Sequence, residues 1–390
     1  MSRRFQYRII SIFAWTVLSF LLYFWYSYAY YESFVRQNNG LIELEEDIRL
    51  ITSTNSNVKP DDVIGATSED MNSPTAATTV IAIPSTTAPR RTTTINPMEE
   101  YHFAGSGIKV DGNGLVNPHP FVFTLNPSRL CKNRDVFLLV YIHSHPDNFE
   151  RRQIVRETWG NVTWYKKSVV LRVFVMGQTE NTAHKHLLKM ESLHYNDIIQ
   201  EDFLDTYRNL TYKAVGALKW VTTYCSHARM ILKTDDDAFV NMFVLLRHLQ
   251  SRLQHGQYGQ GTLACNAWYN SKVDRDGKWA VSKAERRHPV WPTFCQGLAY
   301  IMSPDVVSAL YTMSFDVPYL WMDDVYVTGF LAMKLGLKHY QITRTFVREN
   351  ELIKYISGSH WYRCLFSHVK DLNVTVSMWN ALLSKPGLPM

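Results

Sequence analysis

In the second half of the chain, apolar residues gather in short continuous runs separated by segments with helical spacing. Residues 136–142 and 169–175 form two such runs, and residues 230–232 form a shorter one. Continuous apolar runs of this length are typical of strands that are covered on both faces. Apolar residues at helical spacing predict helices over residues 150–159, 206–223 and 242–253. This alternation predicts an α/β domain with a mainly parallel sheet.

A different apolar run lies near the N-terminus. Residues 9–31 carry no charged side chain and would span about 34 Å as a helix, enough to cross a bilayer. Arg3, Arg4 and Arg8 precede the run, so the positive-inside rule places residues 1–8 in the cytosol. We therefore expect a transmembrane signal-anchor over residues 9–31 and a single-pass type II topology. A cleaved signal peptide is the alternative.

Residues 32–120 have the composition of a spacer. Between residues 65 and 97 they are dense in Thr, Ser and Pro. Such a segment buries too little apolar surface to offset its chain entropy, so we expect a flexible stem. An O-glycosylated stalk and plain disorder both fit this composition. Residues 121–390 would then form a luminal domain.

Composition and charge narrow the class of protein. Of the 390 residues, 46% are hydrophobic and 19% are charged, which excludes a wholly disordered chain. The net charge is +6, and the excess of Lys and Arg lies in the predicted folded half, which suits an anionic ligand. No basic run indicates a nucleic-acid partner. The five cysteines all lie on the predicted luminal side, so at least one stays unpaired within the chain.

The first candidate for chemistry is Asp235-Asp236-Asp237, which follows the apolar run 230–232 after Lys233 and Thr234. Three adjacent carboxylates repel one another unless a cation neutralises them. Oxygen ligands favour hard cations such as Mn²⁺ or Mg²⁺, and ligands of parallel sheets bind beyond the carboxyl ends of strands. The alternative is a solvated loop in which Asp237 caps the next helix.

A second acidic pair is Asp323-Asp324. One carboxylate beside another tends to have a raised pKa, which is useful in a general base. The alternative is a helix N-terminus, where acidic side chains interact favourably with the helix dipole.

Longer motifs occur in a fixed order along the folded half. They are R-R-Q-I-V-R-E-T-W-G from Arg151, F-V-M-G from Phe174, E-D-F-L-D-T-Y-R-N-L-T-Y-K from Glu201, K-T-D-D-D-A-F-V-N from Lys233, W-P-T-F-C-Q-G-L-A-Y-I-M-S from Trp291, D-D-V-Y-V-T-G from Asp323 and R-C-L-F-S-H from Arg363. Together they resemble the β-1,3-galactosyltransferase family (glycosyltransferase family 31), which also contains β-1,3-N-acetylglucosaminyl- and N-acetylgalactosaminyltransferases.

The resemblance implies a GT-A type nucleotide-sugar-binding domain in the Golgi membrane, with its catalytic part in the lumen. It implies an inverting, Mn²⁺-dependent transfer of galactose from a UDP-sugar donor to the 3-hydroxyl of a glycan acceptor on protein or lipid. Transfer of N-acetylglucosamine or N-acetylgalactosamine is the alternative within the family. Rivals from other classes are a metal-dependent phosphohydrolase and an inactive binding or chaperone member. A homodimer is compatible with this interpretation.

The resemblance also assigns roles to individual residues. Asp237 and His368 match the metal ligands, and Asp235 and Asp236 would face the ribose or the donor sugar. Asp324 matches the catalytic base, which would take the proton of the acceptor hydroxyl. Without the family spacing, His368 is more readily interpreted as a structural histidine.

Further residues follow from the same motifs. Arg152 and Arg156 match arginines that line the nucleotide site. Trp291, Tyr326 and Asp323 are assigned to the acceptor side or to the pocket, since aromatic rings often stack on sugar faces.

The chain departs from the family pattern at a few positions. The residue before the base is Asp323 instead of the common Glu, and Met322 precedes it. The residue before Gly297 is Gln296 instead of the usual Ser. We expect these changes on the acceptor side of the site.

Three sequons predict N-glycosylation at Asn161, Asn209 and Asn373. All three lie in the part assigned to the lumen, which agrees with the expected topology.

Overall fold

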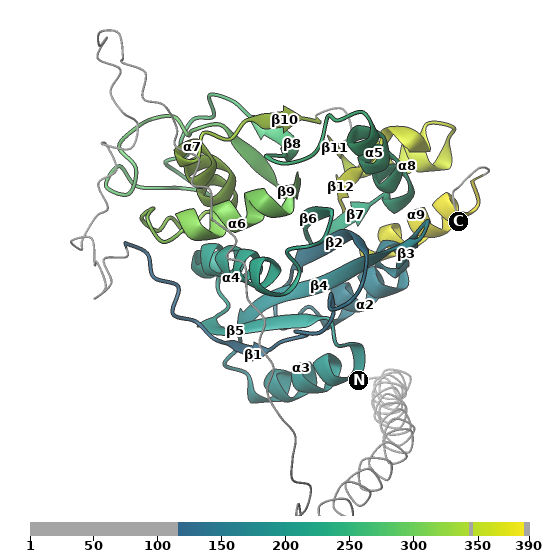
Figure 1. Ribbon diagram of the computed structural model, residues 1–390, viewed down its shortest axis with the longest axis horizontal. Coiled ribbons are helices and arrows are strands. Elements are labelled where there is room, and N and C mark those ends of the chain that lie inside the picture. The colour runs from purple at the N-terminus through teal and green to yellow at the C-terminus, as the bar shows by residue number, and fades with distance from the viewer. Residues whose placement is uncertain (1–115, 343–345, 386–390) are drawn as a thin grey trace, which may run out of the picture. The chain divides into compact units, whose positions relative to one another are not determined.

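The computed structural model describes residues 116–342 and 346–385, and a nine-stranded sheet forms its centre. The strand order is β1-β5-β4-β2-β6-β9-β8-β10, with β3 beside β4 (Figure 1). The strands are β1 (Phe123–Leu125), β2 (Val136–His143), β3 (Trp164–Tyr165), β4 (Ser168–Gln178), β5 (Ile198–Leu204), β6 (Met230–Asp235), β8 (Leu263–Trp268), β9 (Phe294–Met302) and β10 (His339–Gln341).

The sheet is mixed. Strands β5, β4, β2 and β6 run parallel to one another, as the apolar runs predict. Strand β9 is antiparallel to both β6 and β8, and β1 and β3 are antiparallel to their neighbours. The edge strand β10 is again parallel to β8. The prediction of a mainly parallel sheet is therefore confirmed for the centre and wrong for β1, β3 and β9. The chain passes from β8 to β9 without a crossover helix, and only a crossover would make these neighbours parallel.

Helices cover both faces of the sheet. They are α2 (Phe149–Glu157), α3 (Thr182–Tyr195), α4 (Leu210–Tyr224), α5 (Met242–Gln254), α6 (Pro304–Met313), α7 (Ala332–Lys334), α8 (Glu349–Ser357) and α9 (Leu372–Leu383). Buried residues of α4 and α6 join one core, and those of α2, α3, α5, α8 and α9 join the other. Figure 1 shows α4 and α6 to the left of the central strands and α5, α8 and α9 to the right. All eight residues of β2 are buried, as expected of a strand between two cores.

The boundaries of three elements affect the site. Helix α4 begins at Leu210 because residues Tyr207–Asn209 form a separate 3₁₀ turn. Strand β6 continues past the apolar run and ends at Asp235, so this carboxylate belongs to the sheet. Helix α5 begins after Asn241, whose side chain accepts a hydrogen bond from the backbone N–H of Val244.

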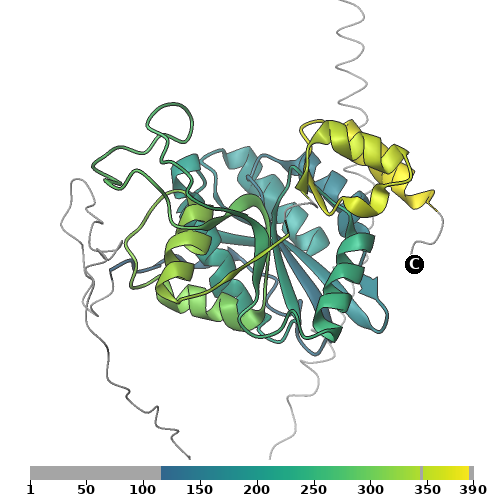
Figure 2. The ribbon, with the colours of Figure 1, turned by 90° about the horizontal axis from the view of Figure 1, so that it is seen from above.

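A second, three-stranded sheet joins the C-terminal segment to the large sheet. Its order is β11 (Phe346–Val347), β12 (Phe366–His368) and β7 (Ala238–Val240). Strand β12 runs antiparallel to β7, which follows the aspartate triplet directly. Figure 2 shows the yellow C-terminal segment on the opposite side from the light-green helices α6 and α7. The pairing therefore brings residues near the C-terminus to the end of β6.

Two disulfides form and one cysteine stays free. Cys131 pairs with Cys225, and Cys265 pairs with Cys295. Cys364 is buried and unpaired, as the odd number of cysteines requires. The sequence left this choice of pairs open.

The predicted cytosolic residues 1–8, the predicted anchor 9–31 and most of the predicted stem 32–120 lie outside the described residues. Within residues 116–342 and 346–385, no helix has both the length and the apolar character needed to span a membrane.

Leu139, in the middle of β2, is fully buried between the sheet and its helices, whereas Leu193 on α3 is 70% exposed. We expect Leu139→Ala to lower the free energy of unfolding by about 2–5 kcal/mol, because it removes buried apolar atoms and leaves a cavity. The same substitution at Leu193 should cost less than about 0.5 kcal/mol. Urea unfolding of the full-length variants measures both, and equal losses would contradict the described core.

Candidate active site

Lys233 and Asp235 lie at the carboxyl end of β6. Lys233 Nζ donates a hydrogen bond to Asp235 Oδ1 at 2.7 Å and another to the carbonyl oxygen of Gly297 on β9. In the pairing of β2 with β6, Asp235 lies opposite His143, the last residue of β2. Burial raises the pKa of Asp235 to about 7, although the Lys233 ammonium opposes this shift. The carboxylate is therefore at the sheet edge where ligands of parallel strands bind.

Asp236 holds the loop between β2 and α2. Its Oδ2 atom accepts hydrogen bonds from Ser144 Oγ at 2.7 Å and from Asn148 Nδ2 at 2.9 Å. Its backbone N–H donates to the carbonyl oxygen of His143 at 3.1 Å. Burial raises the pKa of Asp236, and the hydrogen bonds from Asn148 and Ser144 oppose this shift. Asp236 therefore fixes the position of this loop at the end of β6.

Asp237 and His368 bring a carboxylate and an imidazole together. The distance between His368 Nε2 and Asp237 Oδ2 is 3.1 Å, and the side chains are 49% and 35% exposed. The pairing of β7 with β12 places His368 opposite Ala238, so two distant parts of the chain meet here. A carboxylate oxygen and an imidazole nitrogen are both common ligands of divalent ions. Among residues 116–342 and 346–385, no group of three or more His, Cys, Asp or Glu side chains could hold a metal ion.

The second acidic pair precedes the π-helix η3 (Val325–Leu331). Asp324 caps this helix, and its Oδ1 atom accepts a hydrogen bond from the Val325 N–H at 2.8 Å. The Oδ2 atom of Asp323 lies 3.5 Å from Nδ1 of His143. Burial and then the neighbouring Asp323 raise the pKa of Asp324 to about 7. A carboxylate with such a pKa can accept a proton near neutral pH.

Gly297 links the two acidic clusters. Its carbonyl oxygen accepts the hydrogen bond from Lys233. A Cβ atom added at this glycine would lie 3.0 Å from Asp324 Oδ2, so the Asp324 carboxylate packs directly on the β9 backbone. The site thus brings Asp235, Asp237, His368 and Asp324 to one edge of the sheet, as the sequence predicts.

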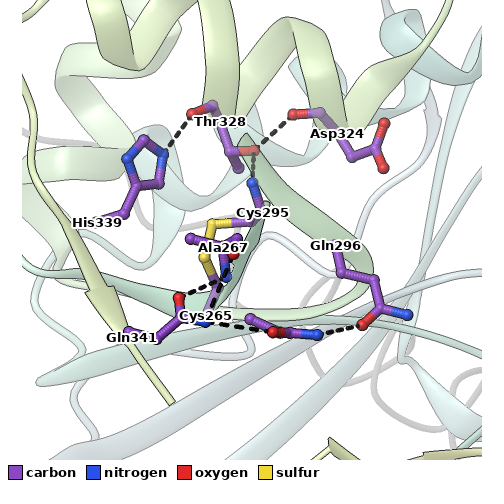
Figure 3. The surroundings of a disulfide bond; sticks show 9 residues. Cys265, Ala267, Cys295, Gln296, Asp324, Thr328, His339 and Gln341 are labelled. Atoms are coloured by element: carbon purple, nitrogen blue, oxygen red, sulfur yellow. Dashed lines mark hydrogen bonds between the residues drawn. A yellow bond between two sulfur atoms is a disulfide. The ribbon is translucent and has the colours of Figure 1, made fainter. Parts of the chain in front are cut away.

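Asp324 is tied to the disulfide Cys265–Cys295 through Thr328 (Figure 3). The Cys295 N–H donates to Thr328 Oγ1 at 2.8 Å, and Thr328 Oγ1 donates to the carbonyl oxygen of Asp324 at 2.6 Å. His339 Nε2 lies 2.7 Å from the carbonyl oxygen of Thr328 and donates to it. The start of η3 is therefore held by a covalently linked pair of strands.

Arg152 and Arg156 are buried and have structural partners. The five N–H groups of Arg152 bind Glu191, Ser144 and the carbonyl oxygens of His145 and Pro146. This set uses every donor of a guanidinium group.

Arg156 forms ion pairs with Glu191 and Asp197, at 2.7 and 2.8 Å. The structure thus gives both arginines a structural role in place of the predicted contact with the donor. Arg152 still affects the site, because it bonds the Ser144 hydroxyl that holds Asp236.

Trp291 and Tyr326 are core residues. Trp291 is buried and packs edge-on against Phe330. Tyr326 is fully buried, and its hydroxyl donates to the carbonyl oxygens of Ser314 and Val317. Neither ring is available to stack on a sugar, so their predicted role in the acceptor side or pocket is replaced by one in packing. Asp323, predicted with them, does lie at the site.

Exposed aromatic rings lie near the second acidic pair. Trp279 is 45% exposed, and its ring is parallel to that of Trp321 at 6.5 Å between centroids. Tyr207 contacts both rings, at 5.4 and 5.6 Å. Trp321 lies two residues before Asp323, so its contact with Tyr207 brings this cluster to the second acidic pair. Burial and then the carboxylates of Asp323 and Asp324 raise the pKa of Tyr207.

We predicted no role at the site from the sequence for His143, Ser144, Lys233 or Thr328. His143 and Ser144 directly follow the apolar run 136–142, so the expected strand end was an available signal. Burial, followed by Lys233 and Lys213, lowers the pKa of His143 well below its ordinary value, so this imidazole is neutral at the site. Lys233 and Thr328 each bond one near residue, Asp235 and Asp324, and one distant residue, Gly297 and Cys295, and the distant contacts give no signal in the sequence.

The three predicted glycosylation sites differ in their surroundings. Asn161 and Asn373 are exposed. Asn209 is partly buried, and its amide donates to the carbonyl oxygen of Leu204 at 2.8 Å. Thr211 of the same sequon is buried and donates to the carbonyl oxygen of Leu320.

Solved structures with a similar arrangement include glycosyltransferases. A galactosyltransferase LgtC bound to donor and acceptor sugar analogues covers 65% of this chain and 97% of its own, with a TM-score of 0.32 and 8% identity. The bifunctional glycosyltransferase WbbM covers 65% of this chain and 50% of its own, with a TM-score of 0.35 and 8% identity. At TM-scores this low, we transfer neither fold nor function from them.

Sequence comparisons give a more specific result. A family model described as "Galactosyltransferase" matches residues 150–343, which contain both acidic clusters. Mouse β-1,3-galactosyltransferase 2 is 31% identical over 280 residues, covering 71% of this chain and 66% of its own length. Human β-1,3-galactosyltransferase 1 is 35% identical over 230 residues, covering 58% of this chain and 69% of its own. The chain therefore belongs to the β-1,3-galactosyltransferase family, glycosyltransferase family 31.

Proposed function

We propose that the protein is an inverting, Mn²⁺-dependent β-1,3-galactosyltransferase with a GT-A type domain. It would move galactose from UDP-galactose to the 3-hydroxyl of a glycan acceptor on a glycoprotein or glycolipid. The observation that carries the proposal is the meeting of two acidic centres at one sheet edge. One centre is the partly exposed pair Asp237–His368, and the other is the partly buried Asp324, which packs on Gly297.

The donor side would be built around Asp237 and His368. Their oxygen and nitrogen atoms are adjacent and exposed, and they fit a divalent ion as ligands. A bound Mn²⁺ would supply positive charge to stabilise the leaving diphosphate. Asp235 and the loop held by Asp236 border the same space, and the buried Lys233 fixes the orientation of Asp235.

Asp324 would act as the general base. Its raised pKa lets the carboxylate accept the proton of the acceptor hydroxyl while that oxygen forms the bond to C1 and the UDP leaves. Its orientation is fixed by the Val325 N–H and by the contact with Gly297. In an inverting reaction, base and leaving group lie on opposite sides of C1, which agrees with two separate centres.

The acceptor would approach along the aromatic cluster beside Asp323 and Asp324. Tyr207 and Trp279 are 37% and 45% exposed, and aromatic rings pack well against the apolar faces of sugars. This replaces Trp291 and Tyr326, which are buried, as the expected aromatic contacts.

We also propose that the protein is anchored in the Golgi membrane by residues 9–31, with the catalytic domain in the lumen. The uncharged run preceded by arginines supports an anchor. The two disulfides agree with an oxidising compartment. Protease protection of the full chain in sealed microsomes tests this topology, and digestion of the folded domain from the cytosolic side would contradict it.

Removal of one metal ligand should abolish Mn²⁺-dependent binding of UDP. We expect Asp237→Ala to weaken UDP affinity at least tenfold in Mn²⁺, because one of two protein ligands is lost. Isothermal titration of the full chain measures this affinity. The exposed Asp276 provides a matched control, and Asp276→Ala should leave the affinity unchanged. Unaltered UDP binding by Asp237→Ala would rule out this metal site.

Asp324→Asn should separate binding from transfer. The amide has nearly the same shape but cannot accept the proton, so we expect a loss of about 10²- to 10⁴-fold in kcat with UDP affinity within about twofold of wild type. Product analysis with UDP-galactose and a glycan acceptor measures transfer. A variant that keeps normal turnover would remove the base assignment. Release of sugar phosphate or phosphate by the wild type without an acceptor sugar would favour the metal-dependent phosphohydrolase.

The pH dependence of transfer should reflect the protonation of Asp324. A base must be deprotonated, and its raised pKa means that the active form is lost as the pH falls through about 7. We expect kcat/KM to fall roughly tenfold per pH unit below that value, with an apparent pKa that belongs to the pair Asp323–Asp324. Steady-state kinetics from about pH 5 to about pH 9 measure the profile. A flat profile through this range would argue against an Asp324 base.

A further inference from the structure

A cavity of about 350 Å³ adjoins the metal-ligand pair. Asn266, Gln296 and Leu298 from β8 and β9 form one wall, and His368 and Lys370 lie on the other. Phe346 and its neighbours at the start of α8 complete the lining. The volume falls within the range of small-molecule sites, and the lining combines apolar and polar side chains as such sites do.

The Gln296 amide is held in one orientation by its neighbours. Its Oε1 atom accepts a hydrogen bond from Asn266 Nδ2 at 2.9 Å. Asn266 Oδ1 in turn lies 3.4 Å from Gln341 Nε2, and Gln341 Oε1 accepts from the Ala267 N–H at 2.8 Å. Within the part of the chain that the structure describes, Gln296 Nε2 donates to no side chain or backbone oxygen. Its two N–H groups are therefore available to a ligand in the cavity.

Gln296 and Asp324 lie on different sides of β9. The Cβ direction of Gly297 points at Asp324 Oδ2, and successive residues of a strand point to opposite faces. Gln296 therefore points away from Asp324 and toward the cavity that His368 lines. Figure 3 shows Asp324 on the Thr328 side of the disulfide and Gln296 on the Gln341 side. This differs from the expectation that Gln296 lies on the acceptor side.

The position of this cavity indicates which sugar it receives. In the proposed reaction the acceptor approaches from the side of the base, and the diphosphate leaves on the opposite side. The donor hexose is bonded to that diphosphate, so its ring must lie next to the ligands Asp237 and His368. The cavity borders His368 and lies on the face of β9 turned away from Asp324, which places it on the donor side.

We propose that this cavity receives the hexose of the nucleotide-sugar donor, and that Gln296 Nε2 donates a hydrogen bond to one of its hydroxyl groups. Gln296 is then a residue that determines donor specificity, since a site built to bind a hydroxyl rejects sugars that lack it in the right position. The inference rests on the proposed function for the location of the diphosphate. To that function the inference adds Gln296 as the residue that recognises the sugar.

The test compares UDP with UDP-galactose, UDP-glucose and UDP-N-acetylglucosamine as ligands of the full chain in Mn²⁺. Gln296→Met keeps most of the side-chain volume but removes the amide. We expect it to weaken binding of the preferred UDP-sugar about tenfold while changing UDP affinity less than about twofold, because UDP has no sugar. Gln257→Met, at an exposed glutamine outside the cavity, is the matched control and should change neither affinity.

The outcomes separate this inference from the proposed function. Unchanged affinity for every UDP-sugar, or an equal loss for UDP and UDP-sugar, would overturn the role of Gln296. A parallel transfer assay tests the proposed function. If the wild type binds but does not transfer, the proposed function fails, and the binding comparison still decides the role of Gln296. A wild type that binds neither UDP nor any UDP-sugar would overturn both.

Discussion

The buried ammonium group of Lys233 holds the two acidic centres of this protein together. It is almost fully buried at the end of β6, bonded to Asp235 and to the backbone of Gly297. Burial works against the charged form of Lys233, but Asp235, Asp323 and Asp324 outweigh it and raise its pKa. Several carboxylates crowded at one sheet edge would otherwise repel one another strongly. One fixed positive charge thus allows the metal-ligand side and the base side to share a single edge.

Sequence patterns predicted those parts of the fold that depend on interactions between residues close together in the chain. The run 136–142 became a fully buried strand because an uninterrupted apolar segment needs cover on both faces. Asp235 and Asp324 were recognisable because adjacent carboxylates are costly without a compensating partner. His368 was recognised only through the spacing of a family motif, since a lone histidine carries little information.

The remaining features depend on contacts between distant parts of the chain. Arg152 and Arg156 lie in a family motif, yet Glu191 and Asp197 on another segment bind their guanidinium groups. Tyr326 lies close to Asp323 and Asp324 in sequence, but η3 turns its ring into the core. Strand β9 is antiparallel to β8 because the chain passes between them without a crossover helix. No pattern of residues in the sequence indicates this. The sequence therefore predicted which acidic residues come together, but not which residues near them in the chain face the same space.

The disulfide Cys265–Cys295 has a consequence for how this enzyme matures. It joins β8 and β9 at the residue whose N–H holds Thr328, and Thr328 in turn holds the backbone of Asp324. Oxidation of two thiols thus fixes the framework behind Asp324, while His368 lies on the separate small sheet. Protein made in a reducing host would lack this covalent link behind Asp324 even where the small sheet had folded, so its activity should depend on whether it was made under oxidising conditions.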